Sequence, residues 1–169
     1  MDDQTTVILY GRPEHGVDMA TRILADAAFH AKHITQDFVV RSLETTGSVI
    51  GTVKITKQPI VSRQFEQGDI VLLFDARMKE VTKRCNNGTL IYNSTEKEKF
   101  KSDKIKVFHV PATQIILDIG RSATLVPVML GAFSKLFGKI PMKYFKIALE
   151  AYGGNYTAFE EGARQVKRG

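Results

Sequence analysis

The residues best suited to chemistry lie in one short loop near the N-terminus, Gly11-Arg12-Pro13-Glu14-His15-Gly16. Glycines permit a tight turn, and a loop that leads into a helix can present free N–H groups to an anion. A strand, such a loop and a helix in succession are typical of phosphate-binding sites. The pattern therefore predicts an anion site at this loop.

Two residues of the loop oppose that chemistry. Pro13 removes one N–H donor, and Glu14 adds a negative charge that costs a nearby phosphate about 1 kcal/mol or more. Arg12 and His15 can replace the missing donors with side-chain N–H groups. The alternative is a purely structural turn in which Glu14 is favoured only by the helix dipole. The candidate cofactor-binding residues are Gly11, Arg12, His15 and Gly16.

The elements around the loop form a repeating pattern. Residues 6–10 are apolar and predict a buried strand, and residues 17–30 carry apolar side chains at helical spacing. Further strands are expected at residues 36–43, 48–55, 70–74, 89–92 and 107–110, and helices at 76–85, 111–118, 122–137, 141–152 and 155–166. We expect residues 86–88 to form a turn and the highly charged residues 96–106 to form a solvated loop.

Strands that alternate with helices, followed by a helical C-terminal third, predict an α/β fold with three layers and a mostly parallel sheet. The length of 169 residues suits a single domain spanning residues 1–169. Asp75 follows a buried strand, where α/β sheets bind ligands, but a helix cap is the favoured interpretation. Asn93 and Ser94 follow the next strand, and a turn is favoured there.

Composition excludes several functions. A single cysteine, Cys85, rules out a disulfide within the chain and a cluster held by this chain's own thiolates. Cys85 follows Lys83 and Arg84, so its thiol is either activated by these charges or inert. His30, His33 and His109 lack metal-ligand spacing. We predict no catalytic residue and no metal site in this chain.

Net charge and hydropathy indicate the kind of partner and the cellular location to expect. The net charge of +6 favours anionic partners without identifying them. The first residues are acidic and polar, which is unlike a signal peptide, and no apolar run is long enough to span a bilayer. We therefore predict a cytoplasmic protein without a nucleic-acid or membrane partner.

Several segments together resemble the gamma subunit of 2-oxoacid:ferredoxin oxidoreductases of the pyruvate and ketoisovalerate type. Gly11 and Gly16 match the ends of that family's G-x-G-G-Q-G loop, and residues 20–28 resemble the helix that follows it. Residues 68–75, 128–132 and 155–162 resemble its central strand, a helical signature and its closing helix. The chain departs from the family where Pro127 replaces an Asn and where residues 43–48 lack an Arg.

The resemblance implies a role in a complex that decarboxylates a 2-oxo acid to an acyl-CoA and reduces ferredoxin. The partners implied are subunits of the alpha, beta and delta type. Thiamine diphosphate, iron–sulfur clusters and CoA are implied for the complex, with no cofactor held by this chain alone. A subunit of an indolepyruvate oxidoreductase is a close variant of this hypothesis. The alternatives are a divergent stand-alone binding or regulatory module that has lost the cofactor site, and an independent nucleotide-binding protein.

Overall fold

The computed structural model describes residues 3–42, 47–60, 67–100, 104–120 and 123–169. They form a seven-stranded sheet in the order β2-β3-β1-β4-β5-β6-β7. The strands are β1 (Thr5–Gly11), β2 (Ile34–Arg41), β3 (Val49–Thr56), β4 (Gly68–Leu73), β5 (Cys85–Asn93), β6 (Lys106–Val110) and β7 (Lys167–Arg168). β1, β4, β5 and β6 are parallel neighbours, and β3 and β7 run antiparallel to them. β2 is antiparallel to β3, so all strands except β3 and β7 point the same way.

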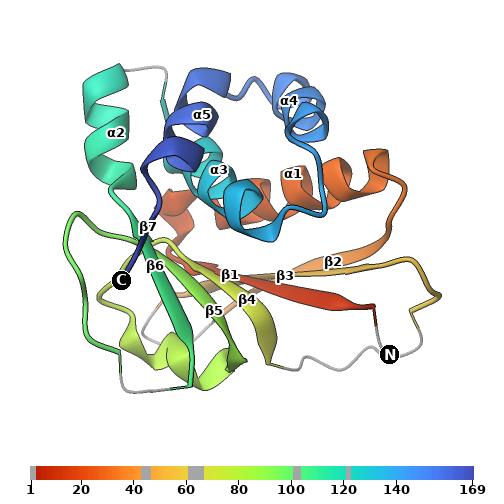
Figure 1. Ribbon diagram of the computed structural model, residues 1–169, viewed down its shortest axis with the longest axis horizontal. Coiled ribbons are helices and arrows are strands. Elements are labelled where there is room, and N and C mark those ends of the chain that lie inside the picture. Colours follow the sequence, from red (N-terminus) through yellow and green to blue (C-terminus); the bar gives the residue numbers. More distant parts are fainter. Residues whose placement is uncertain (1–2, 43–46, 61–66, 101–103, 121–122) are drawn as a thin grey trace.

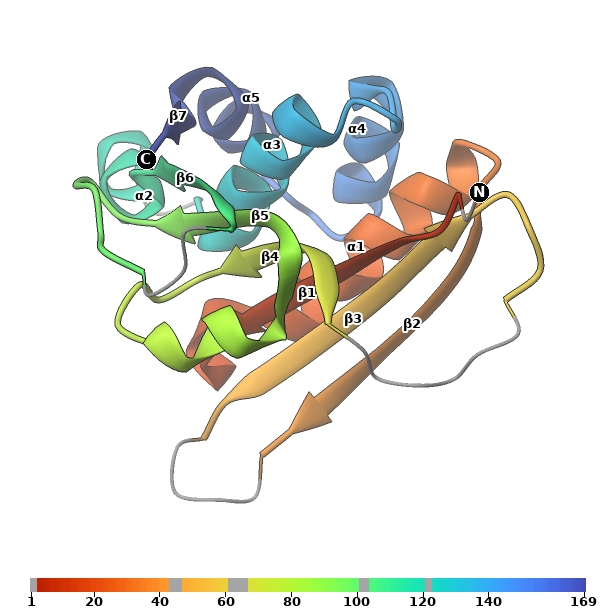
Figure 2. The same cartoon turned by 60° about the horizontal axis from the view of Figure 1, so that its bottom comes forward.

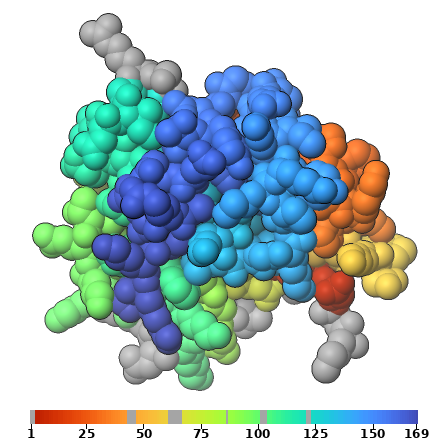
Figure 3. Space-filling model, turned by 45° about the horizontal axis from the view of Figure 1, so that its top comes forward, coloured from red at the N-terminus to blue at the C-terminus, as the bar shows by residue number. Residues whose placement is uncertain are grey.

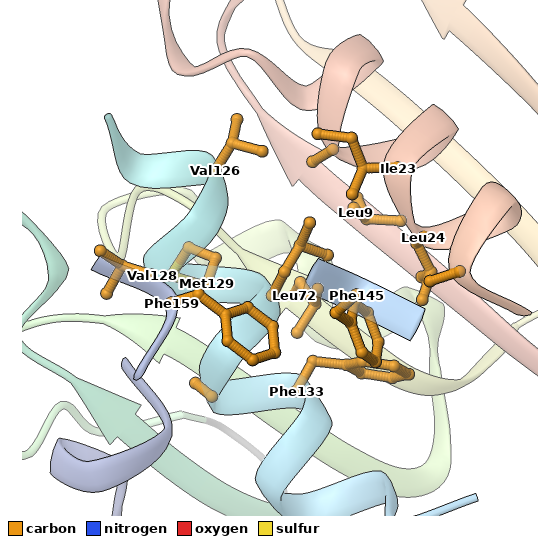
Figure 4. Close-up of a cluster of buried hydrophobic side chains, with 14 of the residues drawn as sticks. Leu9, Ile23, Leu24, Leu72, Val126, Val128, Met129, Phe133, Phe145 and Phe159 are labelled. Carbon is orange, nitrogen blue, oxygen red and sulfur yellow. The ribbon is translucent and has the colours of Figure 1, made fainter. Parts of the chain in front are cut away.

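All the α-helices cover one face of this sheet (Figure 1). They are α1 (Val17–His30), α2 (Ala112–Ile119), α3 (Leu125–Phe137), α4 (Met142–Ala151) and α5 (Tyr156–Gln165). Seen from the helical side, the C-terminal helices form a continuous surface between α2 and α1 (Figure 3). Beneath it, a cluster of apolar side chains joins the sheet to the helices (Figure 4). Its members include Leu9, Ile23, Leu72, Phe133, Phe145 and Phe159.

The other face of the sheet carries a second, smaller core. The 3₁₀-helix η2 (Lys79–Arg84) crosses this face below β4 and β5 (Figure 2). Val81 of η2 packs with Ile8, Leu73 and Tyr92 of the strands. Helices, sheet and this cover form the three layers that the sequence predicts.

Helices α3 and α5 meet through glycines. A Cβ atom at Gly131 would collide with the carbonyl oxygen of Phe159, and one at Gly162 would collide with the carbonyl oxygen of Val128. The two helix backbones approach each other this closely because neither residue has a side chain. The apolar C-terminal helices are thereby fixed against one another over the sheet.

The predicted helix at 76–85 is wrong. Only η2 forms there, because the Asp75 carboxylate binds the backbone N–H of Arg77 and holds the chain in a turn. β5 begins at Cys85 rather than at residue 89, and the predicted turn at 86–88 lies inside this strand. An irregularity in its pairing with β4 accommodates Gly88, where a Cβ atom would collide with the carbonyl oxygen of Asp69.

Smaller differences concern boundaries and one loop. The predicted strand 36–43 is β2, Ile34–Arg41, and the predicted helix 122–137 begins at Leu125; residues 43 and 122 lie outside the described ranges. The charged segment 96–106, of which residues 101–103 lie outside the described ranges, is more than a solvated loop. The centres of the Phe100 and Tyr92 rings lie 4.9 Å apart. Ile105 also packs against the smaller core that contains Tyr92.

Candidate anion-binding site

The predicted loop lies at the topological switch point of the sheet, where the strand order reverses at β1. From β1 the chain passes through α1 to β2 and then β3, which lie on one side of β1, while β4 lies on the other side. β1 and β4 are parallel, so the segments that follow them meet at one edge. Ligands of open α/β sheets bind at such a switch point.

Asp75 is the electrostatic centre of this edge. Its Oδ2 atom lies 3.3 Å from Nε of Arg12 and 2.7 Å from Nη2 of Arg77. Its Oδ1 atom accepts hydrogen bonds from Nε and the backbone N–H of Arg77, at 2.9 and 3.0 Å. The hydrogen bonds from Arg77 hold the pKa of Asp75 well below its usual range, helped by Arg12. The Asp75 side chain is only 8% exposed, whereas that of Arg77 is 82% exposed.

His15 closes the loop on itself. Its Nδ1 atom accepts a hydrogen bond from the backbone N–H of Arg12 at 2.9 Å, and the backbone N–H of His15 donates to the backbone carbonyl of Arg12 at 3.0 Å. The imidazole stacks on Phe74, with 6.4 Å between ring centres. Burial lowers the pKa of His15. A neutral ring whose Nδ1 accepts must carry its proton on Nε2, the only ring nitrogen left to donate to a ligand.

The glycines shape the loop. Gly11 is the last residue of β1, and a Cβ atom there would lie 2.9 Å from Val17 and 3.0 Å from Phe74. Gly16 has φ +74°, and a Cβ atom there would lie 2.9 Å from Val126. Gly16 therefore brings the start of α1 against the start of α3. Pro13 and Glu14 lie between these glycines in the short 3₁₀-helix η1 (Pro13–His15).

Asn93 ties three elements together at the same edge. Its amide Nδ2 donates to the carbonyl of Phe74 at 3.2 Å and to the Thr113 hydroxyl at 2.9 Å. Its Oδ1 accepts from the backbone N–H of Thr113 at 3.2 Å. Asn93 thus joins the end of β4 to the start of α2. It is the last residue of β5 rather than part of a turn, and sequence reasoning missed its bridging contacts.

Two adjoining cavities open at this edge. One, of about 260 Å³, is lined by His15, Asp75, Arg77 and Asn93 among others. The other, of about 390 Å³, has a mainly apolar lining that includes Met19 and Ile116. Both cavities include His15 and Leu125 in their walls, so they form one trough with a charged half and an apolar half. This arrangement suits a ligand with an anionic end and a less polar body.

Other groups considered from the sequence lie apart from the trough. Cys85 is buried at the start of β5, and burial raises the pKa of its thiol, which favours an inert thiol over an activated one. Among the described residues, His, Cys, Asp and Glu side chains form no group of three or more that could hold a metal ion. Within the same ranges no helix is both long and apolar enough to cross a membrane.

Comparison with known proteins identifies the family. The family model for pyruvate ferredoxin/flavodoxin oxidoreductase matches residues 6–167. Pyruvate synthase subunit PorC of Methanosarcina barkeri is 30% identical over 151 residues, which cover 85% of this chain and 83% of that protein. The common gamma subunit of the pyruvate/ketoisovalerate oxidoreductases of Thermococcus litoralis is 29% identical over 152 residues, covering 83% and 82%.

Solved structures share the fold. The pyruvate oxidoreductase subunit PORC of Thermotoga maritima superposes with a TM-score of 0.84 at 22% identity, covering 98% of both chains. The 2-oxoglutarate:ferredoxin oxidoreductase of Magnetococcus marinus gives a TM-score of 0.82 at 18% identity, covering 97% of this chain and 31% of that longer one. The chain belongs to the pyruvate ferredoxin/flavodoxin oxidoreductase family, and its relatives are the gamma subunits of 2-oxoacid:ferredoxin oxidoreductase complexes.

Proposed function

We propose that this chain is the gamma-type subunit of a cytoplasmic 2-oxoacid:ferredoxin oxidoreductase complex. Such a complex decarboxylates a 2-oxo acid oxidatively to an acyl-CoA and passes the electrons to ferredoxin. The observation that carries this proposal is the extent of the family match, which runs from residue 6 to residue 167. Companion subunits of the alpha, beta and delta type complete the complex.

Thiamine diphosphate and the iron–sulfur clusters belong to these companions. A cluster bound by cysteines requires several thiolates, and this chain has only the buried Cys85. The backbone of the loop does not cradle a diphosphate as a glycine-rich loop does, because Pro13 lacks an N–H and Glu14 repels phosphate, so phosphates at this edge are left to side chains. We therefore assign no redox or decarboxylation step to this chain.

The trough at the end of β1 and β4 is the place where this chain approaches the CoA of the complex. The exposed guanidinium of Arg77 and the half-exposed one of Arg12 suit the phosphates of CoA, and the apolar half suits its less polar arm. The Magnetococcus marinus enzyme was solved with coenzyme A and succinyl-CoA bound. Gly11 and Gly16 form the turn, while Arg12 and His15 face the ligand.

A second candidate function is a stand-alone binding or regulatory module. Asp75 already occupies Arg12 and Arg77, and Glu14 lies beside them, so the two positive and two negative charges cancel formally. This charge balance weakens the attraction of the site for a free anion. It therefore supports the alternative in which the chain has lost its cofactor site.

Purification from the native cell separates the two functions. The chain is tagged at its C-terminus and isolated under anaerobic conditions at low salt. We expect companion subunits to elute in fixed ratio, together with thiamine diphosphate and iron. Elution of the chain alone, with the companions found in another fraction, would contradict the subunit role and favour the stand-alone module.

A further inference from the structure

β2 forms one edge of the sheet. It pairs with β3 along its whole length, from Ile34–Thr56 to Arg41–Val49, and no described strand pairs with its other side. Figure 2 shows it as the outermost long strand of the sheet. An edge strand of this length presents backbone groups that can pair with a further strand.

The backbone groups on the open side belong to alternate residues. The N–H of Ser42 donates to the carbonyl of Ser48 at 2.9 Å, which continues the ladder between β2 and β3. In an antiparallel ladder, hydrogen-bonded and non-hydrogen-bonded pairs alternate. Since Ser42 faces β3, the N–H and C=O groups of Asp37, Val39 and Arg41 point to the open side.

These three residues are self-complementary. When a second β2 runs antiparallel with Val39 opposite Val39, Asp37 lies opposite Arg41 of the second copy. Arg41 lies opposite Asp37 of the second copy by the same symmetry. On the other face of the strand, Phe38 lies opposite Val40 of the second copy, again twice. Opposite charges and apolar pairs directly across antiparallel strands stabilise the pairing.

We propose that β2 pairs with β2 of a second copy of this chain, about a two-fold axis at Val39. The side-chain exposure agrees with this pairing, since Val40 is 45% exposed although it is apolar. Arg41 forms an exposed ion pair with Asp18 at 3.3 Å. Such a pair is worth little, so the guanidinium can turn to a new carboxylate. This charge pattern favours a second copy of the chain as the partner, because the same strand carries both the carboxylate and the guanidinium of each ion pair.

Charge reversal tests the register. Sedimentation velocity of the full-length chain over a wide concentration range measures the monomer–dimer equilibrium. Either Asp37→Arg or Arg41→Asp places like charges opposite each other twice, and we expect roughly a tenfold or greater rise in the dimer dissociation constant. The double variant D37R/R41D restores both pairs and should return the constant to within about threefold of the original. Glu150→Arg, on the exposed surface of α4, is the matched control and should change nothing.

Cross-linking tests the axis independently. In a hydrogen-bonded pair the Cα atoms lie about 5.5 Å apart, within reach of a disulfide. The Val39→Cys chain should therefore form a disulfide dimer on mild oxidation, whereas Thr35→Cys should not, because residue 35 lies far from its own copy. The native Cys85 is buried and does not interfere.

Three outcomes would overturn the proposal: a monomer at every concentration, single reversals without effect, or reversals that disturb only the binding of a different subunit. The last would show that another chain occupies this edge. None of these results bears on the CoA trough at the opposite side of β1, so the proposed function is tested separately.

Discussion

Arg12 and Asp75 are 63 residues apart in sequence, yet Nε of Arg12 lies 3.3 Å from Oδ2 of Asp75. One residue follows β1 and the other follows β4, so this contact bridges the switch point of the sheet. Asp75 also binds Arg77, which lines the charged half of the trough, and so holds two guanidinium groups close together. In the proposed CoA site, Asp75 is therefore a positioning residue for these two guanidinium groups.

Replacing Asp75 should lower stability in a pH-dependent manner. Because the folded-state pKa of Asp75 is depressed, its contribution is fully present above about pH 4 and is lost as the pH falls through the folded value. We expect Asp75→Asn to reduce the free energy of unfolding by about 1–2 kcal/mol at pH 7. Urea unfolding of both proteins at several pH values measures this difference.

The difference in the free energy of unfolding between the parent protein and Asp75→Asn should become smaller as the pH is lowered from about 4. Asp118→Asn, on the exposed face of α2, is the control and should stay within about 0.5 kcal/mol of the parent protein. If this difference in the free energy of unfolding stays constant from pH 7 down to the acid transition, the charge of Asp75 does not stabilise the fold.

At pH 6.5 more of the His15 side chain should be neutral in the folded protein than in the unfolded chain, and the neutral ring should carry its proton on Nε2. Burial lowers its pKa, and Nδ1 is engaged by the N–H of Arg12. The folded state therefore resists protonation of His15, and this residue lowers stability as the pH falls below about 6.5. Long-range ¹H–¹⁵N spectra distinguish the tautomers and follow the titration. A protonated Nδ1 in the folded protein would contradict the loop geometry.

The sequence predicted the regular elements well because their signals are local. The apolar runs of β1 and β4 and the helical spacing in α1 are visible within a few residues. The sequence of η2 resembles that of an α-helix, but a side-chain contact prevents one: the Asp75 carboxylate accepts a hydrogen bond from the backbone N–H of Arg77. No periodicity reports such a hydrogen bond. The early start of β5 was missed because Asn and Gly at 86–88 signal a turn in isolation.

The site was only half predictable. The sequence indicated that residues 11–16 form a turn between strand and helix, since glycines and the flanking elements are local features. It did not indicate that Arg12 faces Asp75 or that Asn93 joins β4 to α2, because these contacts depend on strand order. Parallel strands place their carboxyl ends at one edge, so Asp75 and Asn93 could have been grouped with the loop on that rule alone.

A side chain at either glycine of the α3–α5 contact, Gly131 or Gly162, should destabilise the protein. In an ordinary helix Gly→Ala raises stability by up to about 1 kcal/mol. Here we expect Gly131→Ala and Gly162→Ala each to reduce the free energy of unfolding by about 1–3 kcal/mol, because the new Cβ meets backbone of the facing helix. Thermal unfolding of the variants measures the sign directly, and a gain in stability would mean that the two helices lie farther apart.

We propose that this chain presents Arg12 and Arg77 to the CoA of an oxidoreductase complex. Titration calorimetry of CoA into the purified complex tests it most directly, with Arg77→Ala and Arg12→Ala compared against the exposed control Lys143→Ala. Each arginine variant should raise the dissociation constant about tenfold, since a charge-assisted hydrogen bond to phosphate is lost, and the control should not. Equal CoA affinity in all four complexes would contradict the claim.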